Sequence, residues 1–279
     1  MTRQVGSEED SAVPEPDIAR GFRDVDGSDE PSAFVKYLDQ ARGDLVEVGQ
    51  RGRDALALRA GDAVLDVGCG TGEELRALAQ TVGPQGRVVG IDVSERLVAE
   101  ARARTKQTPS IDVLLGDVHA LPFAEDEFSA SRAERVLMHI EHPGRALAQM
   151  ARVTRAGGRV IAIEPDWDTL IIDSHDLRMA RRVARAHADA IRHPDIGRQL
   201  PRLAADAGLE ILNVDHTTIV IRDPERAENR FRLRTAIDSL QDASASSWWD
   251  AVKSGAMRQP FFAAVTGMTL VARKPPRVR

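Results

Sequence analysis

The sequence predicts an α/β protein built on a doubly wound, mostly parallel sheet. Three observations support this prediction. Short apolar, β-branched runs alternate with helical stretches between residues 63 and 163, a glycine-rich turn follows the first run, and an acidic residue stands at or near the end of each of the first three. Short strands separated by helices favour a parallel sheet with helices on both faces. At 279 residues and 42% hydrophobic content, the chain is long enough for one large domain.

The first elements are expected to form a cover and a core. Residues 1–30 are rich in Ser, Glu, Asp, Pro and Gly, and we expect them to be disordered or loosely ordered. Residues 31–60 are expected to form a helical cover, with one or two helices interrupted near Gly43 and a further helix around 53–58. In the core, residues 61–165, we predict helices at 73–82, 94–104 and 143–153 and strands at 63–67, 87–91, 112–115, 128–131 and 159–163.

Beyond Pro165 the alternation of strands and helices stops. Helices are predicted at 174–192, 197–207 and 224–241, and the sixth and seventh strands at 210–221 and 261–272. Residues 166–208 are therefore predicted to be a helical insertion between strands five and six. A second helical region, 223–257, includes a Ser/Ala-rich link after residue 241. We expect residues 31–279 to form a single domain with a seven-stranded sheet.

Composition excludes several classes of protein. The net charge of −5 argues against a nucleic-acid-binding surface, which needs a basic face. Cys69 is the only cysteine, so no intrachain disulfide can form, and a reducing cytoplasmic location is expected. No apolar run approaches the roughly 20 residues of a membrane span. The histidines do not share metal-ligand spacing with carboxylates or the cysteine, so no metal site is predicted.

Four segments carry the chemistry of this chain. Asp66 precedes the turn 68–72, where glycines let the backbone approach a ligand and a helix N-terminus follows. Asp92 ends the second strand, where a carboxylate can accept both ribose hydroxyls of an adenosine. Asp117 follows the third strand, and the segment 133–140 follows the fourth.

These segments, in this order, resemble the motifs of class I S-adenosylmethionine-dependent methyltransferases of the ubiquinone/menaquinone-biosynthesis type. The resemblance is strong over about residues 62–167 and fainter around 213–221 and 261–274. It implies a Rossmann-like methyltransferase fold with a cofactor-binding core at 61–165, S-adenosyl-L-methionine as cofactor and S-adenosyl-L-homocysteine as product. The usual proline of the last motif is Ala156 here, with no expected chemical consequence.

The resemblance also implies roles for particular residues. Asp66 would accept a hydrogen bond from the cofactor ammonium, and Asp117, with the Val118 backbone, would contact the adenine. The residues expected to bind the cofactor are Asp66, Gly68, Cys69, Gly70, Gly72, Asp92, Val93, Asp117, Val118, Glu134 and, as a covering residue, Tyr37. His139 is the catalytic candidate, because the matching loop faces the transferred methyl in the family. We expect it to act as a general base on a hydroxyl, to orient the acceptor, or to pack or hydrogen-bond against the cofactor side.

Several functions remain open. The first is O-methylation of a small molecule in natural-product or secondary metabolism, by a monomer or homodimer. The second is C- or N-methylation of a quinone-like or other metabolite, and the third is a protein that binds the cofactor without transferring the methyl. A nicotinamide-dependent oxidoreductase is disfavoured, because the turn lacks the Gly-x-Gly-x-x-Gly spacing and Asp66 would repel a pyrophosphate.

Overall fold

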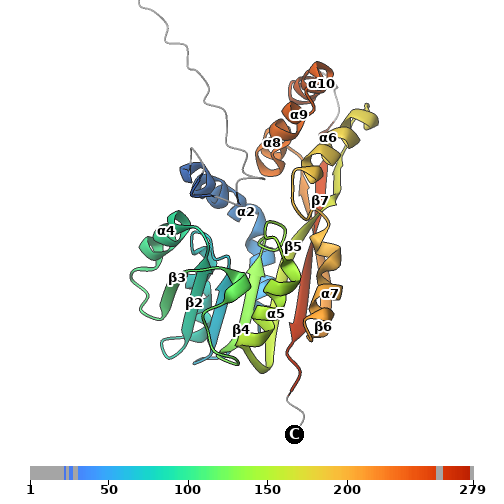
Figure 1. Ribbon diagram of the computed structural model, residues 1–279. Helices are drawn as coiled ribbons and strands as arrows, with labels where there is room; N and C mark the ends of the chain where they lie inside the picture. The colour runs from blue at the N-terminus through green and yellow to red at the C-terminus, as the bar shows by residue number, and fades with distance from the viewer. Residues whose placement is uncertain (1–21, 23–24, 28–30, 256–259, 277–279) are drawn as a thin grey trace, which may run out of the picture.

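The computed structural model describes residues 22, 25–27, 31–255 and 260–276, and the prediction of disorder for residues 1–30 falls largely outside them. A seven-stranded sheet runs through the molecule in the order β3-β2-β1-β4-β5-β7-β6 (Figure 1). The strands are β1 (Ala63–Val67), β2 (Arg87–Asp92), β3 (Ile111–Leu115), β4 (Phe128–Glu134), β5 (Thr154–Ile172), β6 (Glu210–Ile221) and β7 (Ala263–Arg273). Strands β1 to β5 pair in parallel, and β7 pairs antiparallel with both β5 and β6. The predicted fold class is confirmed.

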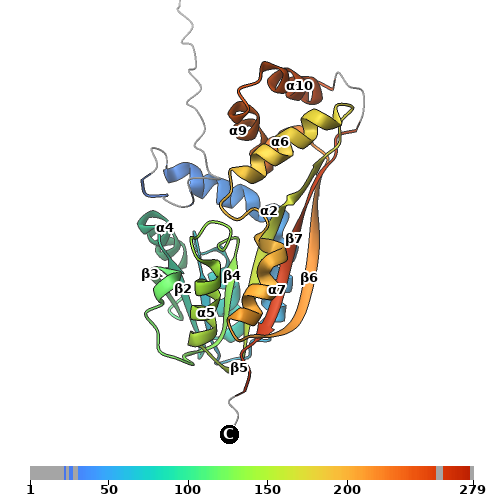
Figure 2. The same cartoon turned by 45° about the vertical axis from the view of Figure 1, so that its right-hand side comes forward.

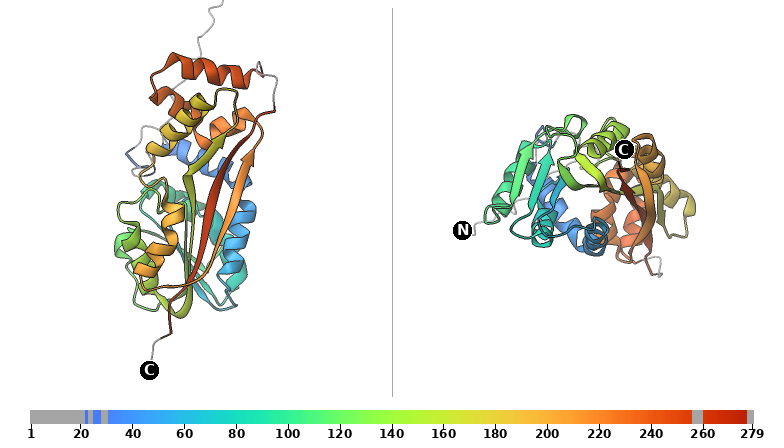
Figure 3. Two further views of the ribbon diagram at one scale, coloured as in Figure 1. Left: turned by 90° about the vertical axis from the view of Figure 1, so that its right-hand side faces the viewer. Right: turned by 90° about the horizontal axis from the view of Figure 1, so that it is seen from below.

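Helices cover both faces of this sheet (Figures 2 and 3). The helices in the described residues are α2 (Pro31–Ala55), α3 (Glu73–Val82), α4 (Glu95–Thr105), α5 (Pro143–Val153), α6 (Leu177–Asp189), α7 (Ile196–Asp206), α8 (Pro224–Phe231), α9 (Leu233–Ser239), α10 (Ala243–Lys253) and the short 3-10 helix η1 (Val118–Ala120). None of the helices in this described part combines the length and the apolar character that crossing a membrane requires.

Alternating side chains of the strands feed two separate cores. Leu65 and Val67 of β1 pack in the core that includes α5, α6 and α7. Val64, the residue before Leu65, points to the other face of the sheet and belongs to a second core with side chains of α2, α3 and α4. Because successive residues of a strand point to opposite faces, an unbroken apolar run is what a strand buried on both faces requires.

Three helical regions differ from the predictions. The cover is one continuous helix, α2, rather than a set of shorter ones. Gly43 has open space around it, and a glycine inside a helix costs only about 0.5–1 kcal/mol, which does not break a long helix. The Ser/Ala-rich link is helix α10, since Asp242 caps it by accepting the Ser244 N–H at 2.9 Å and Trp249 is buried within it. The helical block predicted after β6 divides into α8 and α9 at Arg232.

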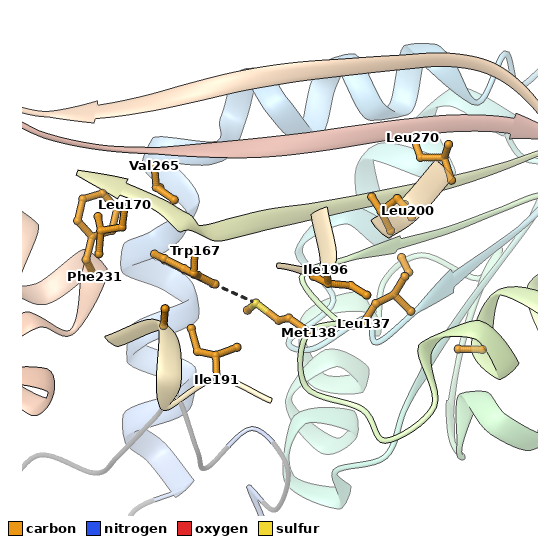
Figure 4. Close-up of a cluster of buried hydrophobic side chains, with 14 of the residues drawn as sticks. Leu137, Met138, Trp167, Leu170, Ile191, Ile196, Leu200, Phe231, Val265 and Leu270 are labelled. Carbon is orange, nitrogen blue, oxygen red and sulfur yellow. Dashed lines mark hydrogen bonds between the residues drawn. The ribbon is translucent and has the colours of Figure 1, made fainter. Parts of the chain in front are cut away.

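The length of β5 also differs from the prediction, because the strand continues past Pro165 to Ile172. Its far half pairs with β7 as far as Ile172 opposite Ala263, so the hydrogen bonds that keep it extended come from a strand about a hundred residues later. This extension carries Trp167 into the helical region. Figure 4 shows Trp167 beside Phe231 of α8, and its Nε1 donates a hydrogen bond to Met138 Sδ at 3.4 Å. The helices after β5 are thereby tied to the loop that follows β4.

Candidate active site

A cavity of about 580 Å³ lies at the carboxyl ends of the central parallel strands. Nearly every residue predicted for the site lines it: Tyr37, Asp66, Gly68, Cys69, Gly70, Asp92, Val93, Asp117, Val118, Glu134 and His139. Gly72 is the exception and lies outside this lining. Parallel strands end at the same edge of the sheet, so residues from separate motifs meet there.

The glycine turn after β1 is shaped by close packing. Gly68 has a φ of +64°, and a Cβ added to it would lie 2.3 Å from Val136 Cγ2. Gly70 has a φ of +53°, and its N–H donates to Asp92 Oδ2 at 2.9 Å. An L side chain is strained in this left-handed conformation, so the turn needs glycine for conformation as well as for space.

Gly72 packs closely against α4. A Cβ there would lie 3.0 Å from Ala101 Cβ of α4, and its φ is +79° where α3 begins. Its small size lets α3 and α4 approach each other. Cys69 is buried, and burial, with the nearby Asp92 and Asp66 carboxylates, raises the pKa of its thiol and keeps it protonated.

Asp92 is positioned to bind a diol. Its two carboxylate oxygens accept the N–H groups of Gly70, at 2.9 Å, and Ser94, at 3.0 Å. A carboxylate offers about four acceptor positions, so two remain for hydroxyl groups in the cavity. Burial raises the pKa of Asp92, opposed by its backbone hydrogen bonds. The site fits a group that brings its own donors, as the two hydroxyls of a ribose would.

Asp26, which the sequence analysis did not single out, lies next to Asp92 at the start of α4. Asp26 accepts the Ser94 hydroxyl at 2.7 Å and the N–H groups of Glu95, at 2.7 Å, and Arg96, at 3.1 Å. It thereby caps α4 beside Asp92 and lines the cavity. Its segment was predicted to be loosely ordered, and only the tertiary contact identifies it.

Asp117 lies at the third strand's end and holds a histidine. Its Oδ1 accepts the His119 N–H at 2.8 Å and faces His119 Nδ1 at 2.7 Å. Burial raises the pKa of Asp117, but these hydrogen bonds outweigh it and hold that pKa below its usual value. The carboxylate is therefore ionised at neutral pH, and in this form both of its oxygens only accept hydrogen bonds, which suits an adenine amino group. His119 also lines the cavity and was not predicted.

A buried arginine organises the end of the cavity near Asp66. Arg132 of β4 is 1% exposed, donates to Asp66 Oδ1 at 3.1 Å and pairs with Glu134. Burial raises the pKa of Asp66 to about 7, opposed by Arg132 and reinforced by the carboxylates of Glu74, Glu134 and Asp92. Sequence reasoning missed Arg132, although a charged residue within the buried strand 128–134 is itself a signal.

Comparisons with known proteins agree with this geometry. Residues 65–162 match a family described as a methyltransferase domain. Over 230 residues the chain is 43% identical to an uncharacterized 37.1 kDa protein in a transposon of Streptomyces fradiae, covering 80% of this chain and 66% of that protein. Over 111 residues it is 40% identical to the 2-phytyl-1,4-naphtoquinone methyltransferase of Thermosynechococcus vestitus, covering 40% of this chain and 49% of that enzyme. A crystal structure from Bacillus halodurans, assigned to the methyltransferases, shares the fold at a TM-score of 0.62 and 19% identity, over 81% of this chain and 98% of that one.

Residues 65–162 are therefore a methyltransferase domain, and the chain has the fold of the methyltransferases. It spans about half the length of the quinone methyltransferase that it matches, 49%. The donor set fits the family's cofactor: a glycine turn that a Cβ would obstruct, and acidic side chains at three strand ends around one cavity.

The loop after β4 carries the methyltransferase's catalytic candidate. The Glu164 carboxylate accepts hydrogen bonds from the backbone N–H groups of Val136, at 2.8 Å, Leu137, at 2.7 Å, and Met138, at 3.4 Å. These bonds fix the conformation of the loop. Burial raises the pKa of Glu164 to about 7, against the effect of these hydrogen bonds. His139 follows the fixed segment and faces the cavity, with the ring of Phe22 5.1 Å from its own.

The far end of the same cavity is lined by residues of the helical region. Arg230, Arg232 and His187 all line it, and none was predicted. Arg230 Nη1 donates to the Tyr37 hydroxyl at 3.1 Å, so the predicted covering residue contacts the helical region as well as the cavity. No motif in the sequence links α8 to the strands, so these contacts had no local signal. In the described part of the chain, no group of three His, Cys, Asp or Glu residues gathers as a metal site.

Proposed function

We propose that this methyltransferase transfers the methyl group of S-adenosylmethionine to a small-molecule acceptor. The observation that carries the proposal is the convergence of Asp66, Asp92 and Asp117 with the glycine turn on one cavity that also holds His139. When bound, the cofactor supplies a methyl carbon on a positively charged sulfur for in-line displacement. The protein's contribution to such a reaction is mainly to hold the acceptor close and aligned.

Each predicted residue has a place in this scheme. Asp92 would accept the ribose hydroxyls with the oxygen positions that Gly70 and Ser94 leave free. Asp117 would accept the adenine amino group. The buried group of Asp66, Arg132 and Glu134 would contact the amino-acid end, where carboxylates complement an ammonium and the guanidinium complements a carboxylate.

We propose oxygen as the accepting atom, in a metabolite of natural-product or secondary metabolism. A hydroxyl acceptor has to lose a proton as it is methylated, and His139 is the base on the loop that Glu164 fixes. His187 is less suited to this role, since burial, with Arg232 and Arg230 nearby, lowers its pKa to about 4. A base that weak removes a proton from a neutral hydroxyl poorly.

A carbon acceptor is the second candidate. The 40% identity to the naphtoquinone methyltransferase favours it, because that protein is named for a quinone-type acceptor. The match covers 40% of this chain, so it supports a shared cofactor region more directly than a shared acceptor.

Screening for a mass gain of one methylene unit, with phenols, hydroxy acids and quinols as acceptors, tests the proposal. Calorimetric titration with S-adenosylhomocysteine tests cofactor binding separately. His139→Gln should lower kcat on a hydroxyl acceptor by about a hundredfold while leaving cofactor affinity unchanged. His142→Gln, at an exposed neighbouring histidine, is the matched control.

Three results would count against the proposal. Absence of binding by S-adenosylhomocysteine at millimolar concentration would refute the cofactor site. A loss of cofactor affinity in His139→Gln with normal residual turnover would give His139 a packing role. Methylation of carbon in quinols with hydroxyl acceptors left unmodified would favour the second candidate.

A further inference from the structure

Helix α6 carries one polar side chain on its buried face. The buried residues of this helix are Met179, Ala180, Val183, His187 and Ala188. Met179, Val183 and His187 follow one another at intervals of four, so they share the face that packs toward the core. An apolar side chain would continue this stripe, yet the third position holds a histidine that is 4% exposed. Helix packing therefore gives no reason for an imidazole at position 187.

The imidazole of His187 has an unsatisfied hydrogen-bonding atom. Its Nε2 is buried, and among the residues that the structure describes none forms a hydrogen bond with it. Most buried polar groups in proteins are hydrogen-bonded, and one that is buried without a partner lowers the stability of the fold. His187 also lines the cavity of the candidate active site. A molecule bound in that cavity can therefore supply the partner that the fold does not.

The cavity wall beside His187 connects it to the loop after β4. The rings of His187 and Trp167 lie edge-on, with centroids 4.5 Å apart and planes at 71°. Trp167 donates its indole N–H to Met138 Sδ at 3.4 Å, and Met138 precedes His139 in the chain. Figure 4 shows Trp167, Met138 and Ile191 in one cluster, and all three line the cavity. Apolar side chains therefore lie between the two histidines along one wall.

His187 is uncharged at neutral pH. Burial, with smaller effects of the charges of Arg232 and Arg230, lowers the pKa of His187 to about 4. A neutral imidazole has one N–H donor and one nitrogen acceptor, and Nε2 takes either role according to the tautomer. A hydroxyl group both donates and accepts, so it matches Nε2 in either tautomer, whereas a carboxylate only accepts and an ammonium only donates. A neutral hydroxyl is therefore the group that suits this position best.

We infer that His187 determines acceptor specificity by hydrogen-bonding a neutral hydroxyl group of the acceptor that is remote from the accepting atom. The inference rests on the proposed function and adds a recognition residue and the chemical group that it selects. The apolar body of the acceptor lies against Trp167 and Met138, because an aromatic ring and a thioether both favour contact with flat apolar groups. The accepting atom lies toward His139. His187 takes no part in the transfer of the methyl group.

Calorimetry with matched probes tests this inference on the full chain. The probes share a phenol and differ in the remote group: 4-hydroxybenzyl alcohol carries a hydroxyl, p-cresol a methyl, 4-hydroxybenzoate a carboxylate and 4-hydroxybenzylamine an ammonium. A longer pair, 6-hydroxymethyl-2-naphthol and 6-methyl-2-naphthol, repeats the comparison of hydroxyl with methyl. Each probe is titrated at neutral pH with and without saturating S-adenosylhomocysteine. We expect the hydroxyl probe of at least one pair to bind about tenfold more tightly than its methyl counterpart, the gain from one buried hydrogen bond.

Variants assign the preference to His187. His187→Phe keeps a ring against Trp167 and removes Nε2, so it should lose the preference for the hydroxyl probe and keep its affinity for S-adenosylhomocysteine. Because it also removes an unsatisfied buried polar atom, its Tm without ligand should rise by roughly 2–4 °C. His187→Gln keeps a hydrogen-bonding group and should retain part of the preference, and it tests the site if His187→Phe fails to fold. His175→Phe, at an exposed histidine, is the matched control and should behave as wild type.

The outcomes separate this inference from the proposed function. Equal affinity for the hydroxyl and methyl probes in both pairs, or tighter binding of the carboxylate or ammonium probe than of the alcohol, would overturn the inference while cofactor binding stands. A lower Tm in His187→Phe together with an intact preference would also overturn it, and would make the ring a packing partner of Trp167. Failure of S-adenosylhomocysteine to bind would overturn the proposed function, and the titrations without it would still measure the preference for a hydroxyl.

Discussion

Replacing Asp92 with asparagine tests the cofactor site most directly. The carboxylate accepts the Gly70 and Ser94 N–H groups, at 2.9 and 3.0 Å, and has acceptor positions left for two ribose hydroxyls. Asparagine keeps the shape but removes the charge and turns an NH₂ group toward one of these positions. Hydrogen bonds to charged groups contribute roughly 1.5–3 kcal/mol, so we expect cofactor affinity to fall by on the order of 1–3 kcal/mol, or roughly 5- to 150-fold.

The effect on folding should be smaller than the effect on binding. Burial raises the pKa of Asp92, so an ionised carboxylate in the ligand-free protein carries a desolvation penalty that asparagine removes. This gain offsets part of the backbone hydrogen bond that is lost. We therefore expect the free energy of unfolding to change by less than about 1.5 kcal/mol, the size of one ordinary hydrogen bond.

Calorimetry with S-adenosylhomocysteine and its 2′,3′-dideoxy analogue provides the assay. Wild type should prefer the natural ribose, and Asp92→Asn should lose most of that preference. Asp112→Asn, at an exposed carboxylate of the neighbouring strand β3, is the matched control and should change neither affinity. An unchanged affinity, or a preference for the ribose that survives in Asp92→Asn, would refute the assignment.

Two further predictions follow from the geometry. Gly68→Ala should lower the free energy of unfolding by roughly 2–4 kcal/mol, because the backbone is left-handed and the added Cβ meets Val136. The double variant with Val136→Ala removes only the steric contact, so urea denaturation should show that it recovers only this part of the loss. A single variant within about 0.5 kcal/mol of wild type, the range of neutral surface changes, would contradict this. Because burial raises the pKa of Asp66 to about 7, above about 3.9 when unfolded, its contribution to stability is greatest at low pH and is lost as pH rises through 7. Affinity for S-adenosylhomocysteine should accordingly increase between pH 6 and 7.5, because Asp66 ionises and can then pair with the ammonium of the ligand. Calorimetry on Asp66→Asn should show an affinity that depends less on pH. An equal pH dependence of the affinity in both proteins would assign it to the titration of another group.

The sequence determined the elements whose signals are local. The bounds of β1, α3, α5 and β6 agree with those predicted from apolar periodicity. The seven strands, the glycine turn and the acidic residues at the strand ends were equally visible. Periodicity works here because the central parallel strands are buried on both faces and most helices on one, which leaves a pattern in neighbouring residues. Parallel pairing then brings the strand ends together at one edge.

Tertiary structure decided the features that depend on distant partners. The extension of β5 needs the pairing of Ile172 with Ala263, and no residue near Pro165 predicts it. Gly72 belongs to the predicted cofactor motif, and only the folded chain shows that its small size also lets α3 approach α4 at Ala101. A local pattern states that a residue must be small, but only the packing around it states why.

The charges of the cavity show the same division. Asp66 was visible as a site residue, whereas its pairing with Arg132 was not, because the two lie on adjacent strands 66 positions apart in the chain. Arg230 reaches the cavity from a helix with no motif of its own. Hydrogen-bonded strand pairing and helix packing place such groups, and the interaction of two charges depends on their separation in space rather than in sequence. The sequence thus identified the strand-end residues that line the cavity, and only the folded chain showed which residues of β4 and of the helical region line it with them.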